Sequence, residues 1–176
     1  MILNTGSRTD IPAFYAEWFV RRVREGFVMA RSPYDPRRIT RYILDPAVVD
    51  LIVFCTKNPA PLLAHGEALA PFRQFWGVTV TPYGTDIEPQ APSVEAAMES
   101  IRTLARVVGS RAVHWRYDPV LITEKYTLEF HKSSFRRMAE GLAGAVENCV
   151  VSFVDLYQKT KRNFPSLREV HAEERL

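Results

Sequence analysis

Cysteine is scarce in this chain: Cys55 and Cys149 are the only two among 176 residues, and they lie far apart. No CxxC pair and no close cluster of histidine and cysteine occurs, so the sequence offers no ligand set for a zinc or iron-sulfur site. Each cysteine lies within an apolar, strand-like run. We therefore expect two buried free thiols and no metal site.

Long apolar runs and nucleotide-binding loops are also absent. A membrane helix needs about 20 consecutive apolar residues, and no stretch of the sequence approaches that length. The opening stretch MILNTGSRTD becomes polar too early for a secretory signal peptide. No P-loop, glycine-rich dinucleotide loop or Ser-His-Asp order is found. The lack of a signal peptide and of a long apolar run predicts a cytoplasmic protein with no membrane contact.

Neither sign of charge shows a large excess. The formal net charge is +3 and the pI is 9.0, while 24% charged and 47% hydrophobic residues are typical of a globular domain. Positive charge is concentrated in one region that contains Arg21, Arg22, Arg24, Arg31, Arg37, Arg38 and Arg41. This region is either a solvated helix face with a basic loop or a contact surface for nucleic acid or a phosphorylated ligand. Because the excess is small, nucleic-acid binding, if it occurs, should be weak and salt-sensitive.

The chain does contain a regular alternation of strand-like and helix-like segments. Helices are predicted from Asp10 to Gly26, from Pro59 to Leu69, over 94–108 between Ser93 and Gly109, and from Thr127 to Leu142. In the first of these, the residues at helical spacing are Ile11, Phe14, Tyr15, Trp18 and Phe19. Strands are predicted at 2–5, 51–55, 75–82 and 149–157, and within 111–123, where Pro119 should end the strand. Residues 27–33 and 39–44 should form two strands or a hairpin.

Strands that alternate with helices predict parallel β-α-β units. At 176 residues, one domain with a substantial core is expected. A closed eight-stranded barrel usually needs about 250 residues. We therefore predict an α/β fold, a partial and open TIM-like barrel of parallel strands alternating with helices, as a single domain over residues 1–176.

The segment RAVHWRYDPVLIT, residues 111–123, places ionisable side chains at alternate positions before Pro119 ends the strand. In a strand, His114, Arg116 and Asp118 share one face, and the apolar and aromatic residues between them share the other. Arg116 and Asp118 are either an internal ion pair or a site in which the arginine orients a ligand and the aspartate acts as acid or base. We interpret His114 and His131 as interior histidines.

Polar residues follow the end of each predicted strand. In parallel α/β folds, the carboxyl ends of the strands form the ligand-binding face. We therefore predict a shared mouth that binds a small-molecule or anionic ligand and contains Arg8, Asp10, Lys57, Asn58, Thr81, Tyr83, Arg116, Asp118, Asp155 and Lys159.

Some of these positions have a second interpretation. Asp10 also fits the N-cap of the helix that follows it. Lys57 is either a solvated lysine or, if desolvated, an anion contact, a base or a Schiff-base former. Lys57 and Asp118 are therefore the candidates for catalysis.

Five ordered motifs, SRTDIPAFY, VFCTKNPAP, TVTPYGTDIEP, WRYDPVL and VVSFVDLYQKT, resemble the bacterial domain-of-unknown-function family 1848 over nearly the whole chain. The resemblance implies a radical-SAM-like enzyme with a partial α/β barrel and a C-terminal cysteine-rich segment that holds an iron-sulfur cluster. For the complete family protein it also implies S-adenosylmethionine. The present chain ends at LREVHAEERL without that segment, which indicates a truncated member with no cofactor of its own.

Three hypotheses about function follow. The first is the barrel portion of a radical-SAM-like enzyme that binds an unknown substrate at the strand ends. The second is a non-catalytic binding domain for a phosphorylated or nucleic-acid ligand, which would use the shared mouth and the basic region. The third is a truncation product without function.

Overall fold

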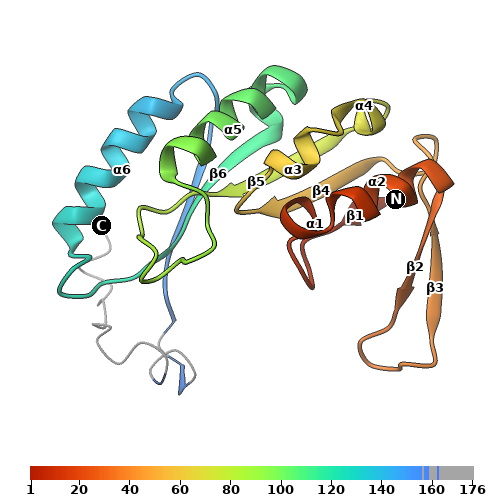
Figure 1. Cartoon of the computed structure of the whole chain (residues 1–176), viewed down its shortest axis with the longest axis horizontal. Helices are drawn as coiled ribbons and strands as arrows, with labels where there is room; N and C mark the ends of the chain where they lie inside the picture. Colours follow the sequence, from red (N-terminus) through yellow and green to blue (C-terminus); the bar gives the residue numbers. More distant parts are fainter. Residues whose placement is uncertain (156, 159–161, 163–176) are drawn as a thin grey trace. The chain divides into compact units, whose positions relative to one another are not determined.

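The computed structural model describes residues 1–155, 157, 158 and 162. The fold is mixed α/β (Figure 1). Five strands form a parallel sheet that is flanked by helices, and two further strands form an antiparallel ribbon. The chain divides into two compact units, Met1–Val78 and Thr79–Leu176, and each is described by itself. The partial TIM-like barrel and the single domain over 1–176 stay predictions.

The first unit is built on parallel strands with a buried aromatic core. β1 (Ile2–Asn4) pairs with β4 (Leu51–Thr56), which pairs with β5 (Gln74–Thr79) at the end of the unit. Burial alternates along β4, so every second side chain points into the core. Phe54 on this strand stacks on Trp76 at 4.2 Å between ring centroids and meets Phe19 edge-on at 5.7 Å.

The helix predicted from Asp10 to Gly26 is broken in the structure. α1 (Ile11–Phe14) and α2 (Ala16–Glu25) are separated at Tyr15, whose φ of −133° and ψ of 25° are not helical. Gly26 ends α2 at a φ of 77°, a left-handed conformation that favours glycine. The segment from Pro59 to Leu69 likewise forms two short helices, α3 (Ala60–Leu63) and α4 (Gly66–Leu69).

The hairpin predicted between these helical segments is present. β2 (Phe27–Arg31) and β3 (Ile39–Ile43) pair antiparallel and form a ribbon, drawn in orange in Figure 1. Val28 pairs with Tyr42 and Met29 with Arg41. Because side chains alternate between faces, Tyr42 lies on one face of the ribbon and Arg41 on the other.

The second unit contains β6 (Val113–Val120) and β7 (Cys149–Phe153), which pair in parallel. The burial pattern of β6 confirms the two predicted faces, because Val113, Trp115 and Tyr117 are buried and the residues between them are half-buried. The prediction that Pro119 ends the strand is wrong. The strand continues to Val120, and the register with β7 shifts beyond Tyr117, where the proline has no amide proton for the ladder.

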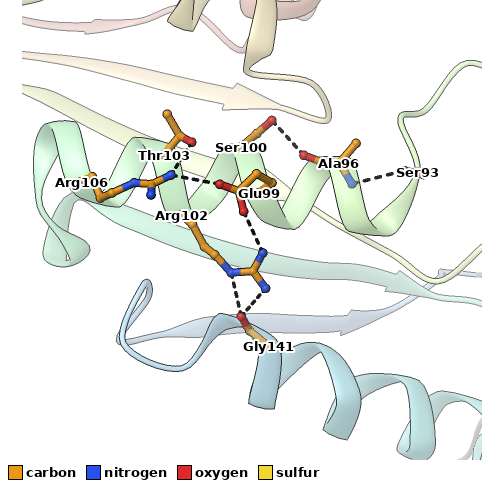
Figure 2. A network of polar contacts seen from close by, with 8 residues as sticks. All are labelled: Ser93, Ala96, Glu99, Ser100, Arg102, Thr103, Arg106 and Gly141. Atoms are coloured by element: carbon orange, nitrogen blue, oxygen red, sulfur yellow. Dashed lines mark hydrogen bonds and ion pairs between the residues drawn. The ribbon is translucent and has the colours of Figure 1, made fainter.

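Two long helices pack together in this unit: α5 (Val94–Val108) and α6 (Leu128–Leu142). Ser93 and Thr127 cap their first turns as predicted, and η1 (Ser110–Ala112), a short 3₁₀ helix, follows α5. Arg102 on α5 donates from Nε and Nη2 to the carbonyl of Gly141, at 3.1 and 2.7 Å, and also contacts Glu99 (Figure 2). A Cβ at position 141 would meet the terminal methyl of Met98 at 2.3 Å, so Met98 would have to change its conformation to accommodate it.

No helix in the described part of the chain is both long and apolar enough to cross a membrane.

Candidate functional site

Asp10 joins two strand ends in the first unit. One carboxylate oxygen accepts from the backbone N–H of Ala13 at 3.0 Å, which confirms the N-cap interpretation. The other accepts from the backbone N–H of Lys57 at 2.9 Å. Because both oxygens are used by backbone donors, Asp10 holds the segment after β1 against the segment after β4.

Asn58 has a similar local role at the end of β4. Its side-chain oxygen accepts from the backbone N–H of Ala60 at 3.2 Å, and its own N–H donates to the hydroxyl of Thr56 at 2.9 Å. These bonds shape the turn between β4 and α3. Whether Lys57 and Asn58 also contact a ligand stays a prediction.

The first unit contains a pocket of about 610 Å³ beside β1. One part of its wall comes from β1 and the loop after it. The rest comes from α1, Tyr15 and α2, and from the β2–β3 ribbon. The lining residues include Leu3, Thr5, Ser7, Arg8, Thr9, Ile11, Tyr15, Trp18, Phe19, Val28, Met29, Arg31 and Tyr42. The pocket therefore adjoins the carboxyl end of a parallel strand, where the sequence predicts ligand binding.

Three aromatic residues at this pocket are partly open to solvent. Tyr15, Trp18 and Tyr42 are 49%, 40% and 36% exposed. Within the described part of the chain, none of these rings stacks on another aromatic ring. Phe19, the fourth aromatic residue of the lining, is instead buried against Phe54. We call the three open rings the pocket rings.

Arg8 stands at the edge of the pocket. Its Nη2 donates to the carbonyl oxygen of Arg31 at 2.6 Å, which ties the loop after β1 to the end of β2. A guanidinium group carries five N–H donors, so this bond leaves most of its capacity for other acceptors. Arg31 also lines the pocket. A cationic side chain therefore accompanies an otherwise largely apolar and aromatic lining.

In the second unit, Arg116 and Asp118 form an ion pair on the half-buried face of β6. The hydroxyl of Ser152, on β7, donates to the other carboxylate oxygen of Asp118. The side chains of Arg116 and Asp118 are 36% and 18% exposed. The structure therefore contains the predicted ion pair. A role of these two residues in ligand binding stays a prediction. Ser152 was not predicted, because only the pairing of β6 with β7 brings it to Asp118.

Tyr83 and Thr81 are engaged within the second unit. The hydroxyl of Tyr83 donates to the carbonyl of Pro119 at 2.8 Å and accepts from the N–H of Leu121 at 2.7 Å. Burial raises the pKa of Tyr83, so the phenol stays protonated. The hydroxyl of Thr81 donates to Glu88 at 2.9 Å. Both side chains are buried and have polar partners, which favours a structural role.

His131 is an interior histidine, as predicted. Its Nε2 lies 2.9 Å from the carbonyl oxygen of Leu121, and its Nδ1 lies 2.7 Å from the hydroxyl of Tyr117. Because a carbonyl only accepts, Nε2 carries the proton and Nδ1 accepts from Tyr117. Burial lowers the pKa of His131, which favours this neutral form.

The remaining predicted residues are placed as follows. Asp155 is exposed after β7, and Lys159 lies outside the described residues. Arg8, Asp10, Lys57 and Asn58 belong to the first unit, and Thr81, Tyr83, Arg116, Asp118 and Asp155 belong to the second. That all of them share one mouth stays a prediction.

The two cysteines belong to different units. Both are free, and both are half-buried rather than fully buried as predicted. Burial raises the pKa of Cys149 to about 11, which keeps its thiol protonated near neutral pH. Among the described residues, no group of three or more His, Cys, Asp or Glu side chains could hold a metal ion. These residues therefore do not fit an iron-sulfur cluster, which usually needs about four thiolates.

The sequence profile of one protein family, described as a domain of unknown function, matches residues 2–176. The chain belongs to that family, DUF1848. No curated protein and no solved structure matches the chain significantly. Membership of DUF1848 confirms the family resemblance but names no ligand, so the chemistry of this DUF1848 chain has to be argued from its pocket.

Proposed function

We propose that this chain is the α/β-barrel portion of a bacterial, cytoplasmic, radical-SAM-like enzyme that binds an anionic small-molecule substrate. The resemblance of its five motifs supports the enzyme class. The pocket of the first unit supports the binding role, because 610 Å³ lies within the range of about 300–1,000 Å³ typical of small-ligand sites. The observation that carries the proposal is Arg8 at the edge of this largely apolar pocket, next to the carboxyl end of β1.

Arg8 gives the pocket its expected preference for anions. A guanidinium binds a carboxylate, sulfonate or phosphate through two parallel N–H donors, and such charge-assisted bonds are stronger than neutral ones. Arg31 also borders the pocket, where its backbone carbonyl accepts from Arg8. Lys57 and Asp118 remain the candidates for catalysis.

A second candidate function has one observation in its favour. The β2–β3 ribbon and its turn carry Arg31, Arg37, Arg38 and Arg41, and Tyr34 in the turn is 95% exposed. Cationic and aromatic side chains together are typical of surfaces that bind single-stranded nucleic acid. A non-catalytic domain of that kind would bind weakly, and its affinity would fall steeply with added salt.

The experiment that tests the first proposal is a ligand-detected NMR screen of small carboxylates, sulfonates and phosphates against three proteins: wild type, Arg8→Gln and Arg24→Gln. Arg24 is an exposed arginine on α2 outside the pocket lining, so it is a matched control for charge. We expect Arg8→Gln to weaken anion binding at least about tenfold, since hydrogen bonds to charged groups contribute about 1.5–3 kcal/mol. Arg24→Gln should bind like wild type. Equal binding by Arg8→Gln and wild type would refute the proposal.

A further inference from the structure

The pocket rings are the feature of the first unit that its folding does not explain. Tyr15, Trp18 and Tyr42 come from the break between α1 and α2, from α2, and from β3, yet all three line one pocket. Between 36% and 49% of each residue is exposed. Grouped, exposed aromatic side chains usually mark a binding surface rather than core packing.

The chemistry of the pocket rings favours one class of ligand. Aromatic faces pair best with other aromatic rings, in offset-stacked or edge-to-face arrangements. The described part of the chain supplies no such ring partner for Tyr15, Trp18 or Tyr42. A bound molecule with a planar ring would supply one.

We propose that the pocket binds a planar aromatic molecule with one anionic group, whose ring packs against the pocket rings and whose charge meets Arg8. This inference rests on the proposed function, because it assigns a ligand class to the same pocket. Arg8 provides the complementary positive charge, and its 2.6 Å bond to the carbonyl of Arg31 holds the guanidinium against the pocket lining. The ligand therefore needs both a ring and an anionic group.

Two other occupants would also fit an apolar pocket. An aliphatic anion would use Arg8 and the apolar walls but would lack the additional energy of ring–ring pairing. An extended peptide could pair with β1, which has β4 as its strand partner within the described part of the first unit. Matched probes can separate the aromatic anion from the aliphatic anion.

The test uses three probes in isothermal titration calorimetry: naphthalene-2-sulfonate, octane-1-sulfonate and the neutral naphthalene-2-sulfonamide. The first has both ring and charge, the second has the charge and an apolar chain but no ring, and the third has the ring but no charge. We expect naphthalene-2-sulfonate to bind about fivefold tighter than octane-1-sulfonate, in line with the energy of an aromatic pair. It should bind about tenfold tighter than the sulfonamide, which cannot offer a full charge to Arg8.

Variants then assign the two interactions. Trp18→Leu keeps an apolar side chain but removes the ring, and it should weaken naphthalene-2-sulfonate about fivefold while leaving octane-1-sulfonate unchanged. Tyr42→Leu should have the same effect and serves as a second variant if Trp18→Leu does not fold. Tyr34→Leu removes an exposed ring outside the lining and should bind like wild type.

The outcomes separate the inference from the proposed function. If both sulfonates bind equally, or if Trp18→Leu and Tyr42→Leu leave naphthalene-2-sulfonate unchanged, the ligand class is wrong although an anion still binds at Arg8. If neither sulfonate binds, or if Arg8→Gln binds both as tightly as wild type does, both the inference and the proposed function are wrong. If a β1-pairing peptide displaces naphthalene-2-sulfonate and binds tighter than every probe, the pocket is a peptide site and the inference is overturned.

Discussion

The two units use their aromatic residues differently. In the second unit, Trp115 stacks on Phe135 at 4.9 Å and donates its indole N–H to the carbonyl of Val80 at 3.0 Å. Tyr117 packs edge-on against His131 and hydrogen-bonds to it. In the first unit, Phe19, Phe54 and Trp76 are buried in the same way, but the pocket rings remain open. The difference indicates that the rings of the second unit stabilise the fold, whereas the pocket rings are available to a ligand.

The largest effect that distinguishes the units should come from their tryptophans. Trp115→Ala should lower the free energy of unfolding by about 3–5 kcal/mol, because it removes a fully buried ring and leaves a cavity. Trp18→Ala should cost less, about 1–2 kcal/mol, because 40% of the residue is already exposed to water. Urea denaturation of both variants measures this. Similar losses would show that Trp18 is part of the core, and the contrast between the units would fail.

An intermediate effect is expected at the ion pair of the second unit. Arg116→Ala removes a partner of the half-buried Asp118 and should lower the free energy of unfolding by about 1–3 kcal/mol. Arg111→Ala is the matched control, because Arg111 pairs with Glu147 at 3.5 Å while 91% exposed. Such a pair contributes about 0–1 kcal/mol. If Arg116→Ala leaves the melting temperature unchanged but weakens ligand binding, Arg116 is a ligand contact rather than a structural partner.

The smallest effect concerns pH and the buried His131. Burial lowers its pKa in the folded chain, so below the ordinary histidine value of about 6.5 the unfolded chain binds more protons than the folded one. Stability should therefore fall as the pH drops below that value and be fully present above it. Melting temperatures between pH 7.5 and 5.5 test this. His131→Gln should reduce the slope.

The sequence predicted the parts of the fold that depend on local signals. Ser93, Gly109 and the apolar stripe between them fix the ends of α5, and the alternation along β6 gives its two faces. The N-cap role of Asp10 is a local signal of the same kind.

Features that depend on tertiary packing were not predictable. Tyr15 and Trp18 fit an apolar stripe at helical spacing, and only the break at Tyr15 leaves them open at the pocket. The contact of Ser152 with Asp118 requires the pairing of β6 with β7, which no local pattern specifies.

The central claim is that a planar aromatic anion binds at the open rings of the first unit and not in the closed core of the second. The chain contains three tryptophans, and each gives one indole N–H signal in a ¹H–¹⁵N spectrum. The indole N–H groups of Trp76 and Trp115 donate to Gln74 and Val80, respectively, whereas Trp18 lines the pocket. In a titration with naphthalene-2-sulfonate, we expect the Trp18 signal to shift and the other two to stay in place. A shift at Trp115 without one at Trp18, or no shift at all, would contradict the account.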